Sequence, residues 1–178
     1  MKKINKNLFN MIATAMLSAL SIVLSRFLSV NLWNMSIGFA FIPILICGML
    51  CGPFWSGVCG AVADLVGALL FPFGVYFPGF TAVAFLNGVI YGFVGITSNK
   101  CKKTLSFSLI SLGLVTFSEL LCSLTLNSLW INLLYAEGYI ATLVSRIPVS
   151  IATVIITAII LIPLRKAVVP SLKKIQNK

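Results

Sequence analysis

The sequence predicts an all-α membrane protein, a single domain over residues 1–178 with six transmembrane helices. Hydrophobic residues make up 60% of the chain and charged residues only 9%, a balance typical of polytopic membrane proteins. Apolar runs follow one another along the chain, and the basic residues gather in short clusters between them, where membrane topology places them. The lipid bilayer is therefore the expected environment.

The first apolar run, Leu8–Leu28, is longer than the apolar region of a signal peptide, so we expect it to be retained as the first helix. The other expected spans are Ile37–Leu50, Phe54–Phe71, Phe80–Thr97, Leu105–Leu126 and Tyr139–Leu164. The second is short against the ~20 residues that cross a bilayer core, so it tilts or begins earlier. Pro148 predicts a kink in the last span and Pro163 predicts its end.

The lysines and arginines orient the chain in the membrane. With six spans, both termini lie on the same side as the loops after the second and fourth spans. This side receives eleven of the 13 basic residues, whereas the opposite side has only Arg26 and Arg146 near its loop edges. The positive-inside rule therefore predicts that both termini are cytoplasmic.

Several classes of function do not suit this composition. The net charge of +10 does not indicate a nucleic-acid partner, because the basic clusters follow membrane topology. The absence of histidine and the presence of only three acids argue against a metal site, a cofactor or an intramembrane enzyme. The five cysteines show no CxxC spacing, so we interpret them as small packing residues.

The means of driving transport is also constrained. The sequence has no GxxxxGK[ST] motif, so it cannot bind ATP by that route. Six spans without an inverted repeat are few for a self-sufficient secondary transporter. If the protein moves a solute, we expect energy and gating to come from partner subunits.

The stretch from Gly60 to Gly92 contains Asp64, an acid inside an apolar run, followed by a break over Pro72–Gly79. An ionisable side chain at membrane depth costs roughly 2.5–3.5 kcal/mol on insertion scales, so it usually faces a cavity or a pathway. The Pro/Gly/aromatic break is suited to cover such a cavity. This stretch predicts a small-molecule binding site.

Polar side chains converge on the outer half of the expected bundle: Arg26, Asp64, Asn87, Glu119, Asn127 and Arg146. One interpretation is an internal ion pair of Asp64 with Arg26 or Arg146 that serves only helix packing. The other is an anionic ligand, because two arginines against Asp64 leave positive charge over. Aromatic residues in the three outer connections, including Trp33, Trp130 and Tyr135, fit either an interfacial belt or loops that cover the site.

Ala15 and Ala19 form a small-xxx-small pair on the first span. A spacing of four residues places both methyl groups on one helix face, where another helix backbone can approach closely. As a pattern alone, the pair is most simply interpreted as packing inside the protein.

Five stretches and one arginine carry a family resemblance: Ala15-x-x-x-Ala19, Ala63-Asp64-Leu65-x-Gly67, Tyr76-x-Pro78-Gly79-Phe80-Thr81, Asn87-Gly88-x-Ile90-Tyr91-Gly92, Asn127-Ser128-x-Trp130-Ile131 and Arg146. Through them the chain resembles the substrate-binding S components of energy-coupling factor (ECF) vitamin transporters, and among these the folate-type members. The alanine pair is common to the wider group. Ser128 stands where folate-type members have threonine and keeps the hydroxyl group.

The resemblance implies the six-helix bundle of S components, such as those for riboflavin and thiamine, in a prokaryotic plasma membrane. It implies a non-enzymatic binder that captures folate from outside and topples in the membrane to release it inside. The partners would be a transmembrane coupling subunit, packed on Ala15 and Ala19, and two cytoplasmic ATPase subunits. An S component for another vitamin and a non-binding assembly subunit are the alternatives.

The resemblance and the residue chemistry together predict a ligand site. Its expected members are Arg26, Asp64, Tyr76, Phe77, Gly79, Phe80, Thr81, Asn87, Asn127, Trp130 and Arg146. The Asp64 carboxylate can accept the adjacent N–H donors of a pterin, and the aromatic rings can stack on the ligand. Arg26 or Arg146 can pair with the glutamate tail.

Overall fold

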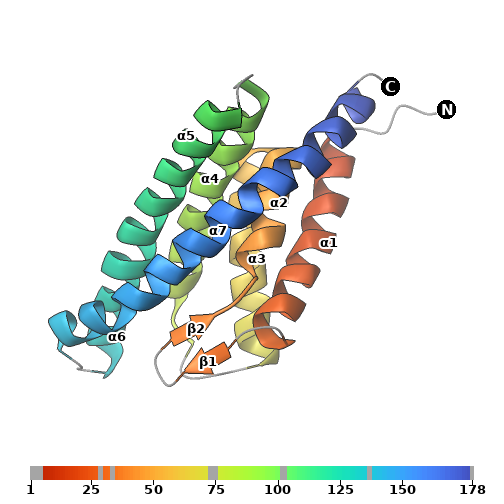
Figure 1. The fold of residues 1–178 in the computed structure, drawn as a ribbon. Helices are drawn as coiled ribbons and strands as arrows, with labels where there is room; N and C mark the ends of the chain where they lie inside the picture. The colour runs from red at the N-terminus through yellow and green to blue at the C-terminus, as the bar shows by residue number, and fades with distance from the viewer. Residues whose placement is uncertain are drawn as a thin grey trace.

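The computed structural model describes residues 6–27, 30–32, 35–71, 76–100, 104–135 and 138–176, which form a helical bundle with one short hairpin (Figure 1). The elements are α1 Lys6–Phe27, β1 Val30–Leu32, β2 Met35–Ile37, α2 Phe41–Cys51, α3 Pro53–Leu70, α4 Pro78–Lys100, α5 Thr104–Ser118, the π-helix η1 Glu119–Leu126, α6 Asn127–Tyr135 and α7 Tyr139–Gln176. Trp33 and the first four residues of the Pro72–Gly79 loop lie outside the described residues.

Six apolar helical stretches occur in this part of the chain, as expected. Five are long and apolar enough to cross a membrane: Lys6–Phe27, Pro53–Leu70, Pro78–Thr97, Ser106–Tyr135 and Tyr139–Lys166. The sixth is the shorter apolar helix α2, over Phe41–Cys51. The predicted all-α membrane fold is therefore confirmed.

Three predicted boundaries are wrong. The second helix begins at Phe41 and not at Ile37, because β1 and β2 pair Val30 with Ile37 in an antiparallel hairpin. The fifth span continues through η1 and α6 to Tyr135, because it contains no proline or glycine after Gly113 that would end it. Residues 127–135 are therefore helical and not an external loop.

The third correction concerns the last helix. α7 extends to Gln176, well past Pro163. Proline removes one backbone donor and favours a kink, but here the flanking leucine- and isoleucine-rich turns continue the helix. The predicted end at Pro163 is therefore wrong.

Figure 1 shows which elements lie at each end of the bundle. The start of α1 and the last turns of α7 lie at one end, whereas the hairpin and α6 lie at the other. Among the described residues, α1 packs only on α2 and α3, at the edge of the bundle. One face of α1 is consequently left without a partner from this part of the chain.

α1 turns its small polar side chains inward and its large apolar side chains outward. Ser18 donates a hydrogen bond to the backbone oxygen of Cys59 (3.3 Å), and Ser21 donates to that of Ala40 (2.9 Å). The outward face carries the exposed residues Leu8, Met11, Ile12, Met16, Leu20, Val23 and Phe27. Such an arrangement, with polar side chains toward the bundle and apolar side chains away from it, is the reverse of that in a water-soluble protein. It suits a membrane helix that makes interhelical hydrogen bonds on one face and contacts lipid or another membrane helix on the other.

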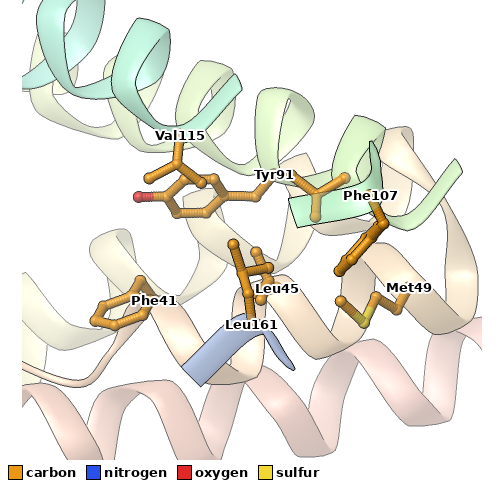
Figure 2. Close-up of a cluster of buried hydrophobic side chains, with 8 residues drawn as sticks. Phe41, Leu45, Met49, Tyr91, Phe107, Val115 and Leu161 are labelled. Atoms are coloured by element: carbon orange, nitrogen blue, oxygen red, sulfur yellow. The ribbon is translucent and has the colours of Figure 1, made fainter. Parts of the chain in front are cut away.

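The hydrophobic core lies where α2, α4, α5 and α7 meet (Figure 2). Its buried members are Phe41, Leu45, Met49, Tyr91, Val94, Phe107, Val115 and Leu161. Because Leu161 of α7 is buried among residues of α2, α4 and α5, the core holds the long helix α7 against these three helices.

α3 and α4 pack against each other more extensively than any other pair of elements. Glycines permit this: a Cβ on Gly60 would lie 2.6 Å from the backbone oxygen of Ala84, and one on Gly88 would collide with the Ser56 backbone. Backbones that approach this closely need small residues at the contact. The packing brings the end of α3 beside the start of α4.

Candidate functional site

Asp64 is hydrogen-bonded to the start of α4. The Thr81 hydroxyl donates to Asp64 Oδ2 at 2.7 Å, and the Tyr76 hydroxyl lies 3.0 Å from Thr81 Oγ1. Asp64 belongs to α3, Thr81 to the first turns of α4, and Tyr76 to the segment directly before α4. The close packing of α3 on α4 therefore supplies the carboxylate with a donor.

Arg26, in the last turn of α1, provides the opposite charge. A Cβ built on Gly67 would lie 3.3 Å from Arg26 Nη2, so the guanidinium rests against α3 one turn beyond Asp64. Arg26 and Asp64 attract each other electrostatically. Of the two arginines that the sequence offered, Arg26 is the one near Asp64, and we name Arg26, Asp64, Tyr76 and Thr81 the Asp64 cluster.

Gly67 was quoted only as part of the family motif and was not among the expected site residues, although it lies next to Arg26. It lies three residues after Asp64, hence on the same face of α3, and its missing side chain leaves room for the Arg26 guanidinium. The signal was the glycine at this spacing from a membrane-buried acid.

Arg146 belongs to a second group, around η1. Its Nη1 donates to the backbone oxygen of Ser123 at 3.1 Å, and it is attracted to Glu119. Glu119 is only 7% exposed and accepts a hydrogen bond from the Tyr91 hydroxyl at 3.3 Å. π-Helical turns are rare and are frequent at functional sites.

Asn87 joins the same group, because the Ser118 hydroxyl donates to Asn87 Oδ1. We name Asn87, Tyr91, Ser118, Glu119, Ser123 and Arg146 the η1 network. Asp64 and Glu119 balance Arg26 and Arg146, so the formal charges of these four side chains cancel. The surplus of positive charge inferred from Asp64 alone is therefore not present once Glu119 is counted.

Aromatic rings from α6, the start of α4 and the segment directly before α4 meet at the same end of the bundle. Phe77 and Trp130 have ring centroids 5.1 Å apart, and Phe77 lies edge-on to Phe80 at 6.3 Å. Trp130, expected in a loop, reaches these rings from α6. We name Phe77, Phe80 and Trp130 the aromatic cluster.

Two buried polar atoms of α6 have no hydrogen-bond partner among the described residues, namely Asn127 Oδ1 and Trp130 Nε1. One is an acceptor and the other a donor. Buried polar groups are nearly always paired, so an orphaned acceptor and donor need an explanation. A polar ligand at this end of the bundle would satisfy both.

Gly79 lies against the rings of both Phe77 and Trp130. A Cβ at this position would lie 2.8 Å from Phe77 Cδ1 and 2.8 Å from Trp130 Cε2, closer than packed side chains allow. The aromatic cluster therefore requires glycine here.

The substitution Gly79→Ala tests this contact. We expect it to lower the free energy of unfolding by about 1–3 kcal/mol, as overpacking does, measured by thermal unfolding of the purified protein. Gly113→Ala is the control, because nothing lies within 4 Å of a Cβ there, and alanine in an exposed helix is favoured over glycine by about 1 kcal/mol. Equal melting temperatures for both variants would contradict the proposed ring packing.

The structure thus brings the predicted site residues into three groups. Asp64, Arg26, Tyr76 and Thr81 form the first, Phe77, Gly79, Phe80 and Trp130 the second, and Asn87 and Arg146 belong to the third, while Asn127 adjoins the second in sequence. Ala15 and Ala19 lie apart from all three, on the exposed face of α1.

Known proteins resemble this chain over most of its length. The family described as ECF transporter, substrate-specific component, matches residues 9–165. The folate transporter FolT of Clostridium novyi (strain NT) is 40% identical over 147 residues, covering 83% of this chain and 80% of that protein. The folate transporter FolT of Leuconostoc mesenteroides subsp. mesenteroides is 34% identical over 126 residues, covering 70% and 64% respectively.

A solved structure is similar as well. The crystal structure of FolT bound with folic acid has a TM-score of 0.76 and 35% sequence identity to this chain, and the match covers 88% of this chain and 92% of that one. Similarity of sequence and fold thus extends over the helices that carry the three groups.

Proposed function

This chain belongs to the family of ECF transporter substrate-specific components, and from this premise we propose that it captures folate at the outer face of a prokaryotic plasma membrane for ATP-driven uptake. The observation that carries the proposal is the match to FolT, including a FolT whose crystal structure contains folic acid. The family is one of transporter components, and its fold places this chain in a membrane.

The Asp64 cluster has the chemistry that a pterin requires. A pterin presents adjacent N–H donors, and a carboxylate offers about four lone pairs for them. Thr81 occupies one of these sites on Asp64 Oδ2, so acceptor capacity remains for the ligand. This arrangement supports Asp64 as the group that recognises the pterin ring.

The rest of the proposed site follows from the other two groups. The rings of the aromatic cluster can stack on the pterin or the aminobenzoyl ring, and Gly79 allows their close approach. Asn127 and Trp130 supply an acceptor and a donor. Arg26 or Arg146 would pair with the carboxylates of the glutamate tail, in place of part of its present pairing with Asp64 or Glu119.

Uptake needs energy that this chain does not supply by a P-loop, since the sequence lacks that motif. We propose that a transmembrane coupling subunit and two cytoplasmic ATPase subunits provide it, with both termini of this chain cytoplasmic. The lysine-rich ends of the sequence and the exposed alanine pair on α1 support this assembly.

The proposal predicts tight folate binding by the purified chain without accumulation by the chain alone. Radiolabelled folate bound to detergent-purified protein measures the first, and uptake into proteoliposomes that contain only this chain measures the second. Riboflavin and thiamine serve as competitors and should not displace the label. Lack of folate binding, or uptake at the rate of a complete transporter, would refute the proposal.

A further inference from the structure

The hydrogen bonds of the Asp64 cluster have a direction that can be deduced. An ionised carboxylate can only accept, so Thr81 must donate its single hydroxyl proton to Asp64. Thr81 then has no proton left for Tyr76, and the 3.0 Å contact between their hydroxyl oxygens must be donated by Tyr76. The three side chains form a relay in which Tyr76 donates to Thr81 and Thr81 donates to Asp64.

This direction decides how Thr81 can act. Its donor is committed to Asp64, and one of its acceptor sites is committed to Tyr76. We propose that Thr81 and Tyr76 are positioning residues that act on the ligand through Asp64, an inference that rests on the proposed function. The relay sets the orientation of the carboxylate that receives the pterin.

Asp64 needs such positioning because two groups attract it from different helices. Arg26 approaches from α1 and lies against Gly67, whereas Thr81 approaches from α4. A carboxylate without the Thr81 bond would turn toward the guanidinium, which favours bidentate pairing with both carboxylate oxygens. The relay therefore keeps lone pairs of Asp64 available to the ligand.

Tyr76, in the segment directly before α4, contributes to the orientation of the Asp64 carboxylate through Thr81. Its side chain is 38% exposed, yet its hydroxyl reaches Thr81 one turn into the helix. A hydroxyl that accepts a hydrogen bond becomes a better donor, so Tyr76 strengthens the bond from Thr81 to Asp64. The effect of Tyr76 on affinity should be smaller than that of Thr81 and should vanish when Thr81 loses its hydroxyl.

A double-mutant cycle tests the relay, with folate as the probe and the full chain in detergent. Thr81→Val should weaken folate binding about 10-fold, as expected for loss of a hydrogen bond to a charged group. In the Asp64→Ala background, which has no side-chain acceptor left for Thr81, the same substitution should cause little further loss, because residues that act through one another are not additive. Thr81→Ser keeps the hydroxyl and should restore affinity.

Control variants separate positioning from a general effect on α4. Thr97 lies on the same helix, and its hydroxyl donates to the backbone oxygen of Phe93 (3.0 Å) within that helix, so Thr97→Val should leave folate affinity unchanged. Tyr76→Phe should weaken binding in the wild-type background and have no effect in Thr81→Val. Apo melting temperatures of all variants identify any that fail to fold.

The outcomes are distinct. Losses that add in the double variant would show that Thr81 contacts folate itself and would overturn the relay. A Thr81→Ser variant as weak as Thr81→Val would show that the methyl group matters, with the same consequence. A wild-type chain that binds no folate would overturn the proposed function, whereas additive losses in a chain that does bind would overturn only the relay.

Discussion

Asp64→Asn is expected to weaken folate binding at least ~10-fold and to change the apo melting temperature little. The amide oxygen can still accept the bond from Thr81, but the amide nitrogen then faces the N–H donors of the pterin. A buried donor without a partner costs roughly 1–3 kcal/mol, more when the lost partner was charged, and each ~1.4 kcal/mol is a factor of ten in affinity. Without ligand, the half-buried amide can bond to water.

The competing interpretation, in which Asp64 only neutralises Arg26, reverses the ranking. Breaking a buried ion pair would lower apo stability by about 3–5 kcal/mol and leave affinity less affected. The measurement is the apo melting temperature beside the folate dissociation constant. A large drop in the first with an unchanged second would exclude the ligand role.

Glu119→Gln is the matched control for this measurement. Glu119 is also an acid among helices near an arginine, but it is buried and bonded to Tyr91. No ligand role is expected for Glu119, so Glu119→Gln should lower the apo melting temperature clearly and change the folate dissociation constant little. Asp64→Asn should therefore affect mainly folate affinity, whereas Glu119→Gln should affect mainly apo stability.

The number and type of helices could be predicted because they depend on local features. Hydrophobic runs of membrane length and breaks at glycine and proline are properties of consecutive residues. The hairpin before α2 was not predicted, because three-residue strands such as Val30–Leu32 have too little alternation to indicate pairing. The extension of the fifth span to Tyr135 was missed because Asn127 and Ser128 were interpreted as a loop, although no helix breaker follows before Gly138.

The members of the candidate site were easier to predict than their pairing. Arg26, Asp64 and Arg146 each stand out as charges in apolar runs, but which arginine lies near which acid depends on the order of helices around the bundle. Glu119 balances Arg146 through η1, and a π-helix has no strong signal in sequence. Gly67 receives the Arg26 guanidinium; its spacing from Asp64 marks the position in the sequence, but which side chain fills the space depends on the packing of α1 on α3.

The open face of α1 has a composition suited to a membrane partner. Ala15 and Ala19 are exposed, while Thr14 and Ser18 are buried and point into the protein. The intramolecular interpretation of the alanine pair is therefore not supported, since the described helices leave these two methyl groups uncovered. The two alanines lie beside large exposed side chains such as Met16 and Leu20. Their small methyl groups allow another helix backbone to approach α1 closely at this point.

Replacing both Ala15 and Ala19 by tryptophan is expected to abolish folate uptake by the assembled transporter and to leave folate binding by the purified chain nearly intact. Large side chains would hold the coupling subunit away from α1, whereas the proposed ligand site lies at the far end of that helix, near Arg26. Uptake is measured in proteoliposomes of the complete transporter, and binding is measured on the chain alone. The control replaces Ile151 and Ile155 by tryptophan. These two residues are exposed and have the same spacing on α7, and the control should preserve both folate binding and folate uptake. Equal loss of binding and uptake in the alanine variant would mean that these methyl groups pack inside the protein, and unchanged uptake would place the coupling subunit on another face.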